Sequence, residues 1–205
     1  IQARKAMIDA GVPVVPGSEG NLANVEEARQ LASKIGYPVM LKATNGGGGR
    51  GIRRCNSEDE LLKNYDRVVS EASKAFGKPE VFLEKCVVNP RHIEVQVLGD
   101  SHGNVIHLFE RDCSIQRRNQ KLIEIAPSPQ LTEAQRRYIG DLAVDAAKAV
   151  KYVNAGTVEF LLDQDNQFYF MEMNTRLQVE HTVTETITGI DIVQAQIRIP
   201  SGLPL

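Results

Sequence analysis

Four consecutive glycines, Gly46–Gly49, restrict the fold of this 205-residue sequence more than any other feature. The run has no Cβ atoms to pack into a core, and it leaves backbone N–H groups free to lie against a ligand. Lys42 precedes the run on an expected strand, and Arg50 follows it. An amide-rich loop beside fixed cations suits phosphate groups, although a plain surface loop accounts for the glycines about equally well. The run fits neither the P-loop nor the dinucleotide-binding pattern.

Composition is that of an ordinary soluble globular chain. Hydrophobic residues make up 42% and charged residues 24% of the sequence, and this length supports a core without disulfides. The net charge of -2 argues against a nucleic-acid binder, and no apolar run approaches the length of a membrane helix. The three cysteines form no zinc or redox pair, which favours reduced thiols and a cytoplasmic location.

Helix caps and hydrophobic periodicity predict an α+β chain. Helices are expected over 1–10, 24–35, 57–76, 132–150 and 190–199. Strands are expected over 38–43, 51–55, 80–87, 92–98, 105–110, 121–126, 157–162 and 167–174. We expect residues 14–87 to form a small α+β lobe, and the rest to form a mainly antiparallel sheet with helices. The alternation over 92–98 predicts a half-buried strand.

The last two strands form a hairpin with two facing carboxylates. If the turn lies midway between residues 165 and 166, Glu159 pairs with Glu172, and Asn174 falls on the same face. Like charges directly opposite on a sheet repel, so they need water or a cation between them. Two carboxylates and an amide oxygen are hard ligands suited to Mg²⁺. Two solvated glutamates on an open face are the alternative, and a slip of one residue in register would remove the argument.

A polar run follows this hairpin. If its backbone is extended, Arg176, Gln178 and Glu180 lie on one face. Arginine can clamp a small oxyanion, glutamine can donate or accept, and a held glutamate can act as a general base. A polar edge strand in water is the plain alternative for any one of the three.

Four separated segments resemble biotin carboxylases in their order and spacing. They are Lys-Ala-Thr-Asn-Gly-Gly-Gly-Gly-Arg-Gly at 42–51, Asn-Pro-Arg-His-Ile-Glu-Val-Gln at 89–96, Glu-Arg-Asp-Cys-Ser-Ile-Gln-Arg-Arg at 110–118 and Glu-Met-Asn-Thr-Arg-Leu-Gln-Val-Glu-His at 172–181. The resemblance runs from end to end. It implies an α+β ATP-grasp fold with a small lid lobe over a mainly antiparallel sheet with flanking helices. Residues 1–13 would be the N-terminal helix of the core, 14–87 the lid subdomain, and 88–205 the core with the metal and bicarbonate sites.

The resemblance also implies roles for individual residues. ATP would be held by Lys42, Gly46, Gly47, Gly48, Gly49, Glu84, Lys85, Val87, His92, Gln116, Asn119 and Leu161. Mg²⁺ or Mn²⁺ would be bound by Glu159, Glu172 and Asn174. Bicarbonate would be held by Lys121, Arg176, Gln178 and the amide of Val179, and Glu180 would deprotonate it. Many family members have His in place of Asn119, which puts that contact to the γ-phosphate in doubt.

The implied activity is ligation driven by ATP. Bicarbonate would attack the γ-phosphate to give carboxyphosphate and ADP, and the released CO₂ would carboxylate biotin, a carrier-bound substrate. Implied partners are a biotin carboxyl carrier protein or domain and a carboxyltransferase subunit, with a homodimeric parent and with no nucleic acid or membrane. The final acyl acceptor is not specified by the sequence.

Two other interpretations stay open at this point. A carbamoyl-phosphate synthetase module shares the carboxyphosphate intermediate but uses ammonia in place of biotin. A non-catalytic nucleotide-binding module would keep the fold without the chemistry. The flanking domains of the family are missing, so we expect the 205-residue chain alone to be a weak or inactive catalyst.

Overall fold

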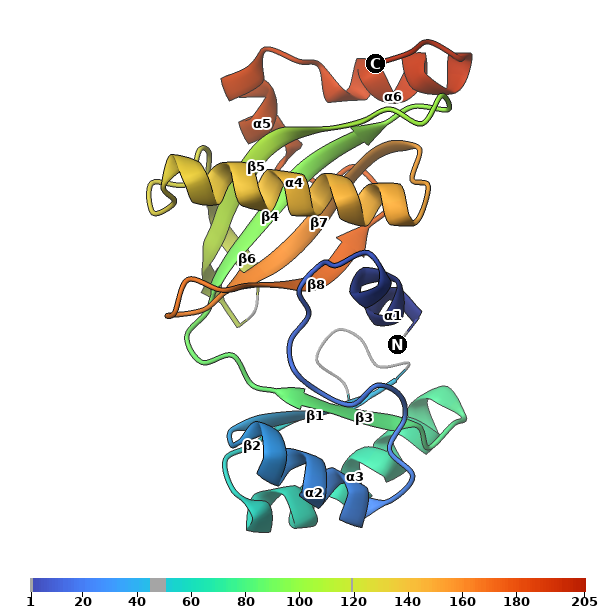
Figure 1. Cartoon of the computed structure of the whole chain (residues 1–205), viewed down its shortest axis with the longest axis vertical. Coiled ribbons are helices and arrows are strands. Elements are labelled where there is room, and N and C mark those ends of the chain that lie inside the picture. The colour runs from blue at the N-terminus through green and yellow to red at the C-terminus, as the bar shows by residue number, and fades with distance from the viewer. Residues whose placement is uncertain (1, 45–50, 119) are drawn as a thin grey trace. The chain divides into compact units, whose positions relative to one another are not determined.

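A computed structural model describes residues 2–44, 51–118 and 120–205 (Figure 1). The chain divides into two compact units, Ile1–Lys5 with Val15–Val87 and Ala6–Val14 with Val88–Leu205. The glycines Gly46–Gly49, together with Arg50 and Asn119, lie outside the described residues. The predictions made for them are therefore not tested by the structure.

The first unit is a small three-stranded sheet backed by two helices. Its elements are α2 (Val25–Ile35), β1 (Val39–Ala43), β2 (Ile52–Cys55), α3 (Glu58–Phe76) and β3 (Val81–Lys85). The strand order is β2-β1-β3, with both pairings antiparallel. Alternate residues Val39, Leu41 and Ala43 are buried against the helices, as the period of two in a strand requires.

The second unit is built on a five-stranded antiparallel sheet of order β6-β5-β4-β7-β8. Its strands are β4 (Arg91–Gly99), β5 (Val105–Arg117), β6 (Gln120–Ile125), β7 (Asn154–Leu162) and β8 (Phe168–Asn174). Its helices are α4 (Glu133–Ala149), α5 (His181–Thr188), α6 (Ile192–Arg198) and the short 3₁₀ helix η1 (Ile199–Ser201), while α1 (Gln2–Asp9) spans the boundary between the units. This arrangement confirms the expected α+β class with a mainly antiparallel sheet.

The two faces of the larger sheet have different chemistry. On one face, Ile93, Val95 and Val97 pack with α4, which lies across the strands in Figure 1. Because side chains alternate, Glu94 and Gln96 point to the opposite face. Both of these polar side chains are fully buried. The prediction of a half-buried strand was therefore wrong for β4, since both of its faces are covered.

Capping signals located the helix starts well. Asn24 accepts a hydrogen bond from the Glu27 amide at the start of α2, and α4 begins with a complete capping box from Thr132 and Gln135. At α3 the box is only half formed, because Glu60 accepts from the amide of Asn56.

Three expectations about element boundaries need correction. Strand β5 runs to Arg117, well past the expected end at residue 110. Helix α5 was not expected at all. The segment 175–180 before α5 is a bend and a turn rather than an extended strand.

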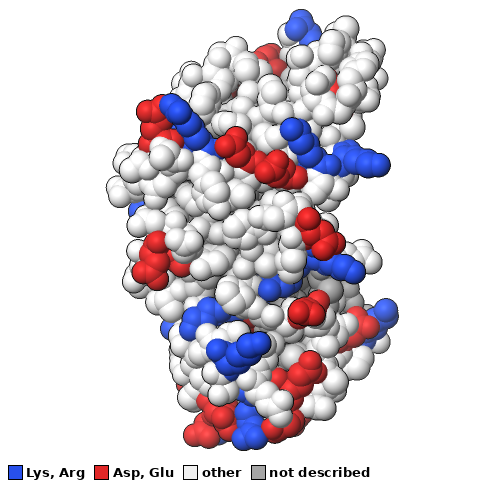
Figure 2. All heavy atoms as spheres, viewed as in Figure 1, with Lys and Arg blue, Asp and Glu red and all other residues white. Residues whose placement is uncertain are grey.

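The surface carries charges of both signs. On the face drawn in Figure 2, Lys and Arg side chains lie among Asp and Glu side chains, without a continuous field of either sign over the coloured residues. Among the residues that the model describes, no helix has both the length and the apolar character needed to cross a membrane.

Candidate functional site

A pocket of about 810 Å³ opens in the second unit beside all five strands of its sheet, β4 to β8. It gathers every predicted site residue of this unit that the structure describes. These residues are His92, Gln116, Lys121, Glu159, Leu161, Glu172, Asn174, Arg176, Gln178, Val179 and Glu180. The pocket thus brings together residues from positions 92 to 180 of the sequence. The nucleotide, metal and bicarbonate roles predicted for these residues therefore fall in one pocket.

The predicted pairing of the two glutamates is confirmed. Glu159 on β7 lies opposite Glu172 on β8, and Thr157 lies opposite Asn174. Glu159 is only 3% exposed, whereas Glu172 is exposed to solvent. The carboxylate and amide oxygens of Glu159, Glu172 and Asn174 therefore border one pocket, and they are the donor type that divalent hard cations prefer.

The register arises differently from the prediction. Next to the turn, Phe160 pairs with Phe170 and Leu162 with Phe168, so the turn is centred on Asp165 itself. A β-bulge between Glu159 and Phe160 then leaves Met171 without a partner on β7. The extra residue shifts the rest of the ladder by one position.

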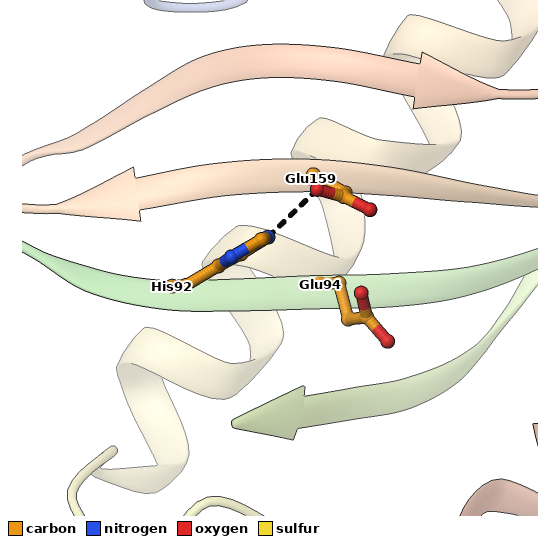
Figure 3. A group of neighbouring side chains, drawn as sticks. All are labelled: His92, Glu94 and Glu159. Carbon is orange, nitrogen blue, oxygen red and sulfur yellow. Dashed lines mark hydrogen bonds and ion pairs between the residues drawn. The ribbon is translucent and has the colours of Figure 1, made fainter. Parts of the chain in front are cut away.

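Glu159 has more hydrogen-bond partners among the described residues than the other carboxylates that line the pocket. Its Oε2 lies 2.7 Å from His92 Nε2, and a dashed line marks this contact in Figure 3. Its Oε1 accepts from Asn174 at 2.8 Å and from Gln178 at 2.9 Å. Burial disfavours the charged carboxylate. The hydrogen bond to His92 and the nearby Lys121 charge outweigh burial and lower the pKa of Glu159 to about 2. Glu159 is thus an anion at neutral pH.

The contacts of His92 fix its tautomer. Gln116 Nε2 lies 2.8 Å from His92 Nδ1, and an amide nitrogen can only donate. Nδ1 therefore accepts, and the proton sits on Nε2, where it is donated to Glu159. His92, Glu94 and Glu159 offer ligand atoms that all lie within 4.8 Å of one another (Figure 3).

Lys121 is the cation at the centre of these carboxylates. Its Nζ lies 2.5 Å from Glu94, 2.6 Å from Glu180 and 3.2 Å from Glu159. Burial opposes the ammonium charge, but the carboxylates outweigh burial and raise the pKa of Lys121 above its ordinary value. Lys121 therefore stays protonated and can attract an anion, but it cannot serve as a base.

Glu180 reaches the pocket from a turn. Because segment 175–180 bends, the expected extended face of Arg176, Gln178 and Glu180 was wrong. The bend still directs all three to the pocket, with Gln178 buried and Arg176 exposed. Burial would raise the pKa of Glu180, but the hydrogen bond from Lys121 lowers it below its ordinary value. The group is therefore an anion that can accept a proton.

Two fully buried residues under the pocket were missed at the sequence level. Glu94 bridges Lys121 and the guanidinium of Arg111, which lies 2.6 Å away. The signal was present in the alternation of β4, where a polar residue at every second position was taken to face water. Only the register of β4 with β5, which pairs Glu94 with Arg111, shows that the polar face is covered.

The predicted site residues of the first unit lie on its three-stranded sheet. Lys42 and Glu84 form an ion pair on the sheet face opposite the helices. Lys85 points the other way and donates to the carbonyls of Gly36 and Tyr37 at the end of α2, at 2.9 and 3.0 Å. Its ammonium is thus engaged within the unit, and its backbone N–H donates to the Pro16 carbonyl at 2.7 Å. Val87 ends this unit.

Comparison with known proteins places these features in a family. The family model described as the carbamoyl-phosphate synthase L chain, ATP binding domain matches residues 1–205. The 2-oxoglutarate carboxylase small subunit of Hydrogenobacter thermophilus is 62% identical over 201 residues, which cover 98% of this chain and 43% of that protein.

Two solved structures are similar over the whole chain. The biotin carboxylase domain dimer of the Hydrogenobacter thermophilus 2-oxoglutarate carboxylase, in complex with MgADP, ADP and bicarbonate, has a TM-score of 0.92 and 61% identity, with 45% of that chain covered. A biotin carboxylase–β,γ-ATP complex from Campylobacter jejuni has a TM-score of 0.94 and 55% identity, with 46% covered. These matches confirm the predicted ATP-grasp fold class. The chain spans less than half the length of the relatives it matches.

Proposed function

We propose that the complete protein carboxylates biotin, because this chain belongs to the family of carbamoyl-phosphate synthase L chain ATP-binding domains. Within that family it is the ATP-binding domain of a biotin carboxylase. The reaction would use Mg-ATP and bicarbonate and release ADP and phosphate. In this proposal residues 14–87 act as the lid, and residues 1–13 and 88–205 form the core.

One observation carries the proposal. The pairing of Glu159 with Glu172 sets two carboxylates at the same pocket as Lys121 and Glu180. A candidate cation site, an anion-attracting ammonium and a candidate base thus share one pocket. ATP-dependent activation of an anion needs these three elements together, because bicarbonate must approach a phosphate of the same charge sign.

The residues present fit a divalent cation. Glu159 is ionised, and its partners His92, Lys121, Asn174 and Gln178 all donate to it, so this carboxylate already attracts positive charge. Glu159, Glu172 and Asn174 would hold Mg²⁺, or Mn²⁺ in its place. When bound, such an ion would offset charge on the nucleotide phosphates.

The chain's own residues would position the bicarbonate. Lys121, Arg176, Gln178 and the Val179 amide would hold the anion, with the exposed Arg176 at the pocket opening. Glu180 would accept the bicarbonate proton as an oxygen attacks the γ-phosphate. Pairing of Lys121 with the incoming anion would loosen its 2.6 Å contact with Glu180 and so make Glu180 a better base.

Binding of the nucleotide is part of the same proposal. The described candidates are Lys42, Glu84, Lys85, the backbone of Val87, His92, Gln116 and Leu161. His92 and Leu161 lie side by side on β4 and β7, since they form a directly paired position of the ladder.

The partners and location belong to the same proposal. A biotin carboxyl carrier protein or domain would present the biotin, and a carboxyltransferase subunit would use the product. The related 2-oxoglutarate carboxylase domain is a dimer, which supports a homodimeric parent. The three cysteines are all free and buried, in keeping with a reducing, cytoplasmic compartment.

The test is turnover by the complete protein that carries this sequence. ADP release should depend on both bicarbonate and biotin, and Glu180→Gln should abolish it while Mg-ADP binding persists. Ammonia in place of biotin tests the carbamoyl-phosphate synthetase alternative. Nucleotide binding without any bicarbonate-dependent ADP release would overturn the proposal in favour of a non-catalytic module.

A further inference from the structure

The guanidinium of Arg111 is completely buried beneath the pocket. A guanidinium has five N–H donors. All five find an acceptor here, namely Glu94 at 2.6 Å, Thr184 at 2.8 Å, Gln96 at 2.9 Å, Gln178 at 3.2 Å and Thr157 at 3.3 Å. Each of these acceptor residues is itself at most 5% exposed.

These acceptors come from separate parts of the second unit. Glu94 and Gln96 lie on β4 and Thr157 lies on β7, whereas Gln178 and Thr184 belong to the turn before α5 and to α5 itself. Arg111, from β5, therefore joins the sheet to the segment that carries Gln178, Val179 and Glu180. A lysine could not replace it, because an ammonium has three donors and no planar fork.

The contacts of Gln178 determine which end of its amide faces which neighbour. Its Oε1 lies 3.2 Å from Arg111 Nη2, and its Nε2 lies 2.9 Å from Glu159 Oε1. Arginine can only donate and an ionised carboxylate can only accept. The reverse orientation would set the amide oxygen against Glu159 and the amide NH₂ against Arg111, with neither contact a hydrogen bond.

We propose that Arg111 is a positioning residue for the anion: it holds the oxygen of Gln178 and thereby makes the amide NH₂ the end that faces the pocket. Gln178 lines that pocket, and an NH₂ group has a second hydrogen beyond the one given to Glu159. An oxyanion is stabilised by a donor and repelled by a carbonyl oxygen, so the orientation favours bicarbonate. This inference rests on the proposed function, and it adds a residue that does not line the pocket.

Steady-state kinetics of the complete protein separate this role from simple support of the fold. Arg111→Lys should raise the KM for bicarbonate about tenfold, since one hydrogen bond to a charged group is at stake, and should leave the KM for ATP within about twofold. Arg136→Lys is the matched control. Arg136 also binds a buried glutamate, Glu110, at 2.9 Å, but it lies on α4, so the KM for bicarbonate should stay within about twofold.

A double-substitution cycle gives the sharper readout. If Arg111 acts through Gln178, Arg111→Lys should change the KM for bicarbonate by less than about twofold when Gln178 is already alanine. If Arg111→Lys does not fold, Gln178→Glu provides a second test of the positioning role. Arg111 would then hold one carboxylate oxygen and leave the other facing the anion, so this variant should have a higher KM for bicarbonate than Gln178→Ala.

The outcomes are distinct. Independent, multiplicative effects in the cycle, equal rises in both KM values, or equal KM values for Gln178→Glu and Gln178→Ala would each overturn the positioning role while leaving the proposed function intact. If the unsubstituted protein shows no bicarbonate-dependent ADP release, the proposed function fails first, and the role of Arg111 fails with it.

Discussion

Glu159 lies directly opposite Glu172 across the β7–β8 ladder, yet of the two only Glu159 is buried and accepts hydrogen bonds from the residues that the structure describes. The two carboxylates therefore contribute differently. The negative charge of Glu159 is stabilised by hydrogen bonds within the protein, whereas the charge of Glu172 depends more on solvent.

Substitution of Glu172 should separate these contributions. Glu172→Gln removes a like-charge cross-strand pair and should stabilise the metal-free protein by about 0.2–1 kcal/mol. The same change should reduce the rise in Tm that millimolar Mg²⁺ produces in the parent chain. Thermal unfolding with and without Mg²⁺ measures both effects. Asp145→Asn, an exposed change on α4, is the control, and an equal Mg²⁺ response in all three proteins would contradict the metal assignment.

Lys121 should contribute strongly to stability. Lys121→Met leaves Glu94, Glu159 and Glu180 without their shared ammonium, and we expect a loss of about 1.5–3 kcal/mol in the free energy of unfolding. Urea denaturation at pH 7 measures the loss. Lys148→Met, at an exposed site on α4, should change stability by less than about 0.5 kcal/mol. Equal effects of the two substitutions would contradict the ion-pair network.

Asp112 should make stability depend on acid pH. Burial opposes its charge, but hydrogen bonds from Ser114 and Arg91 outweigh burial and lower the pKa of Asp112 below its ordinary 3.8. Its stabilisation is thus fully present above the unfolded pKa and is lost as pH falls through the lower folded value. Asp112→Asn should cost about 1–3 kcal/mol at pH 7.

The difference between Asp112→Asn and the parent chain should shrink as the pH falls below 3.8. Urea midpoints at pH 7 and pH 3 give this comparison, with the exposed Asp141→Asn as control. A difference that stays constant between the two pH values would show that Asp112 keeps an ordinary pKa.

The ring of His107 leaves no room for a side chain at Gly140. A Cβ added to Gly140 would lie 2.6 Å from His107 Cε1, so Gly140→Ala forces the ring to move and should cost about 1–3 kcal/mol. In a His107→Ala background the same change should instead stabilise α4 by about 0.5–1 kcal/mol, because alanine favours helix. Thermal unfolding of the four proteins tests the pair, and a destabilising Gly140→Ala in both backgrounds would point to another cause.

Calorimetric titration of the 205-residue chain with Mg-ADP should give saturable binding. Lys42→Ala should weaken that binding about tenfold, because a phosphate contact by an ammonium is lost. Lys34→Ala, in the last turn of α2, provides a lysine control. Saturable binding that Lys42→Ala leaves unchanged would remove Lys42 from the nucleotide site.

Local signals predicted much of the fold. Asn24, Thr132 and Gln135 located helix starts because a cap depends on neighbours within one turn. The hairpin pairing was also correct at Glu159, although the turn centre was misplaced and a bulge made up the difference. The correct pairing therefore depended on a β-bulge that offsets the shift of the turn centre, and the sequence pattern does not indicate this bulge.

The missed features depend on contacts between distant segments. The polar alternation of β4 does not indicate whether Glu94 meets water or Arg111, since that is decided by the pairing of β4 with β5. The bend at 175–180 has a similar origin, because Gln178 is drawn inward by Arg111 and Glu159. The patterns of the hairpin and of the polar run after it pointed to six pocket residues, and family resemblance supplied the rest. The six are Glu159, Glu172, Asn174, Arg176, Gln178 and Glu180. The structure adds the buried pair beneath them.

The extra residue at Met171 lets one strand present two kinds of side chain to two faces of the sheet. Phe168 and Phe170 are buried in the hydrophobic core, whereas Glu172 lines the pocket opposite Glu159. These three positions are two residues apart, so in a regular strand their side chains would point to the same face. The β-bulge separates them. A register without the bulge would turn either the phenylalanines or the glutamate to the wrong face.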